Sequence, residues 1–380
     1  MRRTGPELLR IVAILMVIVL HYLSQADLVP EAGTALKAGQ GFGAMAEGLC
    51  IMSLNTWVLI SGYFMTEDSF KPRRLVSLLL EIYFYLIGGY VVLLALGVIK
   101  FSDLGGIYGI IQRLFPISSS AYWFMSAYVV VYIFSPVLCA GIKSLTRGRM
   151  KTVIAALLFF HVIIKSFVPV RFVTDHGGYD TLWFLVLFLI AGYLRKYGSS
   201  LFMLDMDGKG SRVRGAAAFV FCGLAMGILT LVFHGIVMRT GHFHDYMDIF
   251  YEHNFILCIL GSTGLFVAFL MTDLPEKISR IVLSVSPSVT GIYLLHEHPE
   301  IRGRWLSWLC KIFGDVPYTF IPLLFIHVLI CVITVFTAGL IVDKVRMLIF
   351  SGISRLLPAR LSGKSRDFHR DTPQAGRGAA

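Results

Sequence analysis

Charged residues are scarce in this chain of 380 residues: Asp, Glu, Lys and Arg together make up 15% of it, whereas hydrophobic residues make up 56%. Soluble domains contain about 25% charged and about 45–50% apolar residues. The mean hydropathy is +0.75. A soluble surface cannot be covered with so few charges, so the composition predicts an integral membrane protein.

Motifs for nucleic-acid binding and for metal binding are also missing. The net charge is +11, but the basic residues lie between apolar runs and form no nucleic-acid-binding motif. The six cysteines are scattered and include no CxxC pair, so they indicate neither a disulfide framework nor a zinc site. The histidines within 242–245 and 296–298 lack further ligands at matching spacing. We therefore expect no nucleic-acid partner and no metal.

Apolar runs of roughly twenty residues, the length that spans a bilayer, are what the chain has in abundance. They predict an all-α bundle of about ten transmembrane helices, at residues 7–24, 44–65, 75–99, 121–142, 152–170, 180–197, 213–238, 249–272, 279–298 and 318–343. Lys and Arg are concentrated in every second connecting segment, which predicts that both termini are cytoplasmic. The simplest division is a transmembrane domain, 1–343, and a basic cytoplasmic tail, 344–380, that is partly disordered. We expect a multi-pass protein of a bacterial plasma membrane.

The first apolar run, LLRIVAILMVIVLHYL (8–23), contains two ionisable side chains, Arg10 and His21. On a helix these two positions differ by only ~20° around the axis and lie ~16 Å apart along it. A face that carries both groups has to contact protein or a wet cavity rather than lipid. Two simpler interpretations stay open: Arg10 extends to the headgroups, and His21 forms a packing contact. Spacing alone does not separate a transporter from an enzyme.

Six segments of the chain carry a family resemblance. They are the R-x10-H spacing of the first run, NTWVLISGYFM (55–65), FKPRRLVSLLLEIYFY (70–85), YWFMSAYVVVYIFSPVL (122–138), WFLVLFLIAGYLRKY (183–197) and VTGIYLLHEHPEIR (289–302). In this order they resemble the acyltransferase-3 family of membrane O-acyltransferases, and the last is similar to the form in polysaccharide-modifying members. The resemblance covers roughly residues 5–345. It implies transfer of an acyl group, usually acetyl from acetyl-CoA, to a hydroxyl of a cell-surface or lipid-linked polysaccharide, such as an exopolysaccharide.

That chemistry suggests roles for several residues. A hydroxyl that attacks a thioester needs a base that titrates near neutral pH, so His21 is the first candidate, either as the base or as a carrier of the acyl group. Arg10, Arg73 and Arg74 would bind the phosphates of coenzyme A bidentately, although Arg73 and Arg74 could simply mark the cytoplasmic side. Glu81 shares a helix face with Arg74 and would orient His21 or pair with an arginine.

Aromatic and histidine side chains predicted at the outer side are candidates for the acceptor site. Trp123 and Tyr128 could stack on a sugar ring, although aromatic belts at membrane interfaces are common. Tyr293 and His296 share a helix face, and His296 would bind the acceptor or position the carbonyl. The alternative function is a multi-pass transporter or flippase for a glycan precursor, which predicts paired repeats that the sequence lacks.

Overall fold

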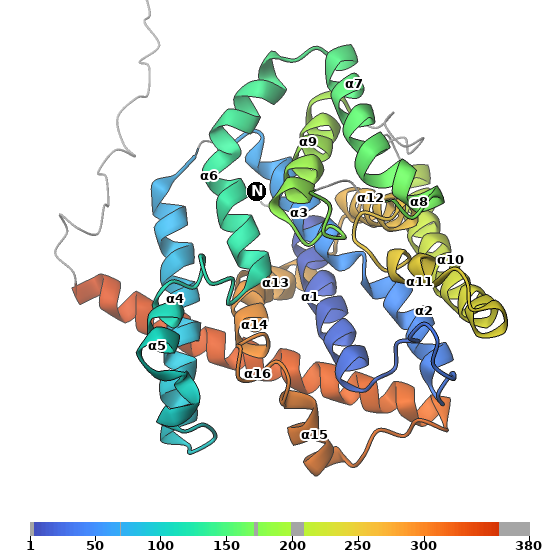
Figure 1. Ribbon diagram of the computed structural model, residues 1–380. Coiled ribbons are helices and arrows are strands. Elements are labelled where there is room, and N and C mark those ends of the chain that lie inside the picture. The colour runs from blue at the N-terminus through green and yellow to red at the C-terminus, as the bar shows by residue number, and fades with distance from the viewer. Residues whose placement is uncertain (1–3, 69, 171–173, 199–208, 357–380) are drawn as a thin grey trace, which may run out of the picture.

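The computed structural model describes residues 4–68, 70–170, 174–198 and 209–356 of the chain. Every regular element within these ranges is a helix (Figure 1), which confirms the all-α prediction. The helices are α1 (Thr4–Gln25), α2 (Gln40–Cys50), α3 (Ser53–Met65), α4 (Pro72–Ala95), η1 (Phe101–Leu104), α5 (Gly106–Leu114), α6 (Trp123–Ser144), α7 (Arg147–Leu158), η2 (Phe159–Ile163), α8 (Ile164–Phe167), α9 (Thr181–Tyr197), α10 (Lys209–Thr240), α11 (His244–Ile249), α12 (Ile256–Leu270), α13 (Glu276–Val285), η3 (Ser286–Ser288), α14 (Val289–His296), α15 (Trp305–Phe313) and α16 (Ile321–Leu356).

Eight helical segments in the described part of the chain are long and apolar enough to cross a bilayer. They are Thr4–Gln25, Gln40–Met65, Pro72–Ala95, Trp123–Ser144, Arg147–Phe167, Gly210–Thr240, Glu276–His296 and Ile321–Ile353. The other two predicted spans correspond to shorter helices, α9 with 17 residues and α12 with 15. The prediction of 249–272 was too long at its start, because residues 250–255 form turns before α12. The count of ten and the cytoplasmic termini stay predictions.

Several helix ends follow directly from the local sequence. Asp180 precedes α9, and its carboxylate accepts a hydrogen bond of 2.8 Å from the backbone N–H of Trp183, which satisfies one of the free donors of the first turn. Gly198 follows α9 with a φ of 69°, a conformation that glycine adopts without steric cost. Pro72 occupies the start of α4, where its fixed φ suits a first helical turn.

Helix α1 lies inside the bundle and packs against α2, α3, α12, α13, α14 and α16 (Figure 1). The long helix α16 crosses below α1 and α14 in the view of Figure 1 and contacts both. Many large apolar side chains of the other helices are exposed, among them Val91 of α4, Phe221 of α10 and Leu348 of α16. Such side chains suit contact with lipid. The arrangement therefore keeps the ionisable residues of α1 among other helices.

Helix α16 continues beyond residue 343, where the predicted transmembrane domain ends, to Leu356. Arg346 of this helix is buried. Its guanidinium contacts Glu81 of α4 at 3.2 Å and Asp343 at 2.7 Å, so its charge is paired inside the bundle. Residues 344–356 of the predicted tail are therefore helical, and 357–380 lie outside the described residues. The division into two domains stays a prediction.

Close packing of α10 against α12 depends on glycine. A Cβ atom added to Gly264 would lie 2.7 Å from the carbonyl oxygen of Gly215, closer than van der Waals contact allows. We expect Gly264→Val to separate the two helices and to lower stability by roughly 1–3 kcal/mol. Thermal unfolding of the detergent-solubilised protein measures this effect. Gly235→Ala, on the partner helix α10 at a position in open space, is the control, and equal midpoints for the two variants would contradict the prediction.

Candidate functional site

Two cavities adjoin inside the bundle. The arginine cavity, about 900 Å³, is lined by Glu7, Arg10, Trp57, Ser61, Phe64, Met65, Asp68, Arg74, Ser77, Leu78, Glu81, Phe124, Met125, Tyr128, Tyr132, Arg195, Ser286, Pro287, Val289 and Thr290. The histidine cavity, about 260 Å³, is lined by Ile14, Val17, Leu20, His21, Ser24, Glu47, Ile51, Ser53, Leu54, Trp57, Trp123, Phe124, Met125, Tyr179, His253, Thr290, Tyr293 and Glu297. Trp57, Phe124, Met125 and Thr290 line both cavities, so these side chains form the wall between them.

Arg10 and His21 of α1 face different cavities. Arg10 lines the arginine cavity, and His21 lines the histidine cavity. On an ideal helix the two positions are ~16 Å apart along the axis. One helix therefore supplies a cation to the first cavity and an imidazole to the second.

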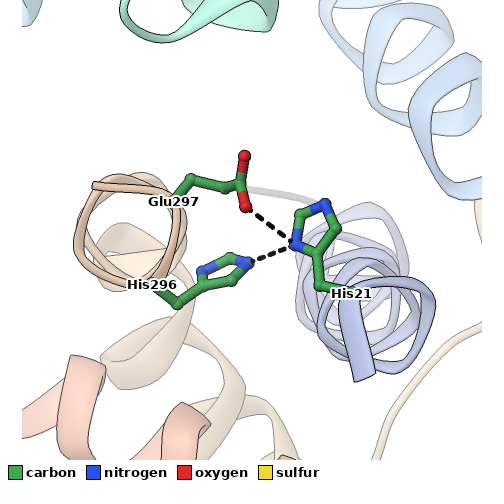
Figure 2. Close-up of side chains that lie close together, drawn as sticks. All are labelled: His21, His296 and Glu297. Carbon is green, nitrogen blue, oxygen red and sulfur yellow. Dashed lines mark hydrogen bonds and ion pairs between the residues drawn. The ribbon is translucent and has the colours of Figure 1, made fainter. Parts of the chain in front are cut away.

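Three side chains meet at the histidine cavity (Figure 2), and two of them, His21 and Glu297, line it. The Nδ1 atom of His21 lies 3.1 Å from Nε2 of His296 and 3.1 Å from Oε1 of Glu297. His296 ends α14, and Glu297 is the next residue. Both are buried, whereas the His21 side chain keeps 30% of its surface exposed. His21 is therefore the member of this cluster that remains accessible to a ligand.

The hydrogen bonds of the cluster define which ring nitrogens carry protons. Nδ1 of His296 lies 2.7 Å from the carbonyl oxygen of Ile292, and a carbonyl only accepts, so this nitrogen carries the proton. Nε2 of a neutral His296 is then an acceptor, like the carboxylate of Glu297. Both acceptors face Nδ1 of His21, which must donate. Nε2 of His21 consequently has a free lone pair, and Figure 2 shows it pointing away from both partners.

The same cluster contains three groups of metal-ligand type. Their ligand atoms lie within 4.8 Å of one another. His298, two residues from His296, is not part of the cluster, because its Nε2 atom lies 3.1 Å from the carbonyl oxygen of Leu86. The separations between His21, His296 and Glu297 are those of hydrogen bonds, which account for the cluster without an ion. The expectation of no metal stays a prediction.

The arginines of the first cavity are paired with carboxylates. Arg10 contacts Glu7 at 3.0 Å, and Arg74 contacts Asp68. Hydrogen bonds from Lys71 and from Arg74 lower the pKa of the Asp68 carboxyl against the opposing effect of its desolvation. Asp68 is therefore ionised at neutral pH. An anionic ligand would compete with carboxylates for these guanidinium groups.

Only some of the predicted donor-site residues line the arginine cavity. Arg10 and Arg74 line the arginine cavity, whereas Arg73 does not. Glu81 also lines it but pairs with Arg346, at 3.2 Å, which is the ion-pair alternative considered for this residue. The carboxylate that contacts His21 is that of Glu297. Its position next to His296 in the segment LLHEHP was the available signal.

Three of the predicted acceptor residues line a cavity, whereas the fourth, His296, lines neither and contacts His21 instead. Trp123 and Tyr293 line the histidine cavity, whereas Tyr128 lines the arginine cavity. The ring of Trp123 packs at a centroid distance of 4.9 Å from Tyr179 and 6.4 Å from His253. Sequence reasoning missed Tyr179 and His253, because both lie in connecting segments far from Trp123 in the chain.

A buried ion cluster holds the segment that carries His253. The ammonium group of Lys165 is fully buried and lies 2.8 Å from Asp175, and it also contacts Glu252 and Asn254. Nδ1 of His253 lies 3.2 Å from the carbonyl oxygen of Ile51. These contacts tie the two sides of the histidine cavity together and fix the aromatic wall.

Comparison with known protein families gives a match over most of the chain. The family model described as an acyltransferase domain matches residues 3–343 of the chain, which confirms the resemblance inferred from the six segments. No curated protein and no solved structure matches the chain significantly. The matched range contains both cavities and the cluster at His21.

Proposed function

This chain belongs to the acyltransferase-3 family and is thus a membrane acyltransferase, and we propose that it transfers an acetyl group from acetyl-CoA to a hydroxyl of a cell-surface or lipid-linked polysaccharide. The observation that carries the proposal is the hydrogen-bonded cluster of His21, His296 and Glu297 beside a cavity. A proton acceptor oriented by a carboxylate is the arrangement that activates hydroxyl groups in acyl transfer.

In the proposed reaction, Nε2 of His21 takes the proton of the sugar hydroxyl. The hydroxyl oxygen attacks the thioester carbonyl, and the carbon–sulfur bond breaks as the tetrahedral intermediate collapses. The proton held by His21 then passes to the departing thiolate, which leaves as coenzyme A. Glu297 stabilises the imidazolium formed in between, since its carboxylate faces Nδ1 at 3.1 Å.

The arginine cavity supports a phosphate-bearing donor. Guanidinium groups bind phosphate through paired hydrogen bonds, and this cavity has them on separate helices, with Arg10 on α1 and Arg74 on α4. With the N-terminus in the cytoplasm, as predicted, this cavity faces the compartment that contains acetyl-CoA. The pantetheine arm would extend past Trp57 toward His21, over a distance of ~16 Å along α1.

The acceptor belongs to the second cavity in this proposal. Its wall includes Trp123, Tyr179 and Tyr293, and aromatic faces pack against the apolar faces of sugar rings. Glu47 adds a carboxylate whose Oε2 atom is buried without a hydrogen-bond partner among the described residues. A buried polar atom without a hydrogen bond is costly, and a sugar hydroxyl would satisfy this one.

The direct test uses the purified chain in proteoliposomes with acetyl-labelled acetyl-CoA and surface glycan isolated from a strain that lacks the gene. We expect the label to appear in the glycan as an ester that mild alkali removes. If the glycan stays unlabelled but crosses the vesicle membrane, the transporter alternative replaces the proposal.

Substitution of Arg10 tests the donor site. We expect Arg10→Lys to raise the KM for acetyl-CoA by roughly tenfold, because an ammonium group lacks the planar fork that binds phosphate bidentately. Steady-state kinetics with a fixed acceptor concentration measures the change. Arg280→Lys, at an exposed ion pair with Glu276, is the control and should leave the KM unchanged. An unchanged KM for Arg10→Lys would exclude phosphate binding by Arg10.

A further inference from the structure

A third guanidinium group lines the arginine cavity. Arg195, near the end of α9, shares this cavity with Arg10 of α1 and Arg74 of α4. Three cations therefore reach the same space from three different helices. No charge pattern in the sequence groups them, since Arg195 lies more than a hundred positions from either of the others.

Packing holds the guanidinium of Arg195 in place. It lies over the ring of Tyr63, with 4.9 Å between the guanidinium carbon and the ring centroid. One terminal nitrogen also donates a hydrogen bond of 3.2 Å to the Tyr63 hydroxyl. Stacking on an aromatic face is a preferred mode of arginine. Tyr63 is buried, so this support remains whatever the guanidinium binds.

The carboxylate partner of Arg195 is easily replaced. Arg195 forms an ion pair with Glu67, whose side chain is 61% exposed to solvent. Exposed ion pairs contribute little to stability, because water solvates both ions well. The Nε–H of Arg195 is in addition buried without a hydrogen-bond partner among the described residues. The guanidinium thus has donor capacity that Glu67 and Tyr63 do not use.

We propose that Arg195, which lines the arginine cavity from α9, binds a phosphate group of the coenzyme A donor. This inference rests on the proposed function and extends it, because it assigns a specificity residue for the nucleotide part of the donor. Coenzyme A carries a pyrophosphate and a 3′-phosphate, and a cavity with guanidinium groups on several walls can bind both ends of that nucleotide. Glu67 is displaced when the donor binds.

Equilibrium binding to the purified full chain in detergent tests the proposal, with CoA and dephospho-CoA as probes. We expect Arg195→Gln to raise the Kd of CoA about tenfold or more, as expected for loss of a hydrogen bond between two charged groups. Arg280→Gln removes the same charge at an exposed site outside the cavity and should change the Kd less than twofold. The dephospho-CoA measurement identifies the phosphate: an unchanged Kd for this probe in Arg195→Gln assigns the 3′-phosphate, and a raised Kd assigns the pyrophosphate.

Two results would overturn the inference. One is a Kd of CoA that is equal in Arg195→Gln and in the wild type. The other is an equal loss in Arg280→Gln, which would indicate a general effect of charge. If Arg195→Gln unfolds, Arg195→Lys retains the charge and should still bind CoA more weakly than wild type because it lacks the fork; binding as tight as wild type would count against the proposal. Failure of the wild type to bind CoA would instead contradict the donor of the proposed function.

Discussion

Glutamine in place of His21 is expected to lower acetyl transfer by roughly 10²-fold or more, the usual contribution of a positioned acid–base group. Glutamine retains hydrogen-bonding capacity toward His296 and Glu297, so the local packing is largely kept. It has no nitrogen that can take a proton near neutral pH. The measurement is the amount of labelled O-acetyl groups formed on surface glycan by membranes that contain the variant at the wild-type level.

A matched histidine elsewhere in the bundle serves as the control. His327 of α16 is buried, and its Nδ1 atom lies 2.6 Å from the hydroxyl of Tyr22, a neighbour of His21 on α1. His327 lines neither cavity. His327→Gln should therefore affect stability more than the rate of the folded enzyme. Normal acetylation by His21→Gln would remove His21 from the mechanism.

Replacement of Glu297 by glutamine is expected to lower the rate by roughly 10²-fold, through loss of the charge that stabilises the His21 imidazolium. The amide is nearly isosteric with the carboxylate, so a fall in kcat with little change in KM for acetyl-CoA is expected. An amide nitrogen turned toward His21 would in addition favour the wrong tautomer of the imidazole. Steady-state kinetics on the reconstituted protein separates kcat from KM.

Glu300 provides the comparison for Glu297. It lies on the same connecting segment but pairs with Arg304 at 3.4 Å and with Arg113 at 3.8 Å. It lines neither the arginine nor the histidine cavity. Glu300→Gln removes one carboxylate from the same region and should retain kcat within about twofold of wild type, since Glu300 pairs only with Arg113 and Arg304 in the described contacts and lines neither cavity. A similar loss of kcat in both variants would show that Glu297 acts only through folding.

Helical periodicity predicted the parts of the site that lie on one helix. Arg10 and His21 were expected on one face, and that geometry needs only the regular rotation per residue. The same rotation explains why two pairs of residues that are close in the chain do not line the same cavity. Arg73 and Arg74 are neighbours in the chain, but successive residues point ~100° apart, so only Arg74 reaches the arginine cavity. Trp123 and Tyr128 diverge by ~140° and line different cavities.

Contacts between distant segments could not be predicted in this way. The contact of Glu297 with His21 depends on how α14 packs beside α1 and on the turn after His296, and no periodicity encodes either. The position of the Arg195 guanidinium depends on the packing of α9 against α3, because α3 supplies Tyr63. The continuation of α16 beyond residue 343 could not be predicted for a similar reason. Lys344 and Arg346 resemble the start of a cytoplasmic tail, but the partners of Arg346 on α4 and α16 keep it inside the bundle.

The wall between the two cavities has a consequence for the electrical properties of the membrane. Trp57, Phe124 and Met125 contribute bulky, largely apolar side chains to it, and the rings of Trp57 and Phe124 meet edge to face at 6.0 Å. A continuous water-filled path through the bundle would conduct protons and dissipate the potential, which is worth about 2.3 kcal/mol per elementary charge at 100 mV. Hydrophobic constrictions stop conduction because water does not wet them. In the proposed reaction the acetyl group, still bonded to the thioester arm, reaches His21 past this wall, and the wall keeps water and ions from following it.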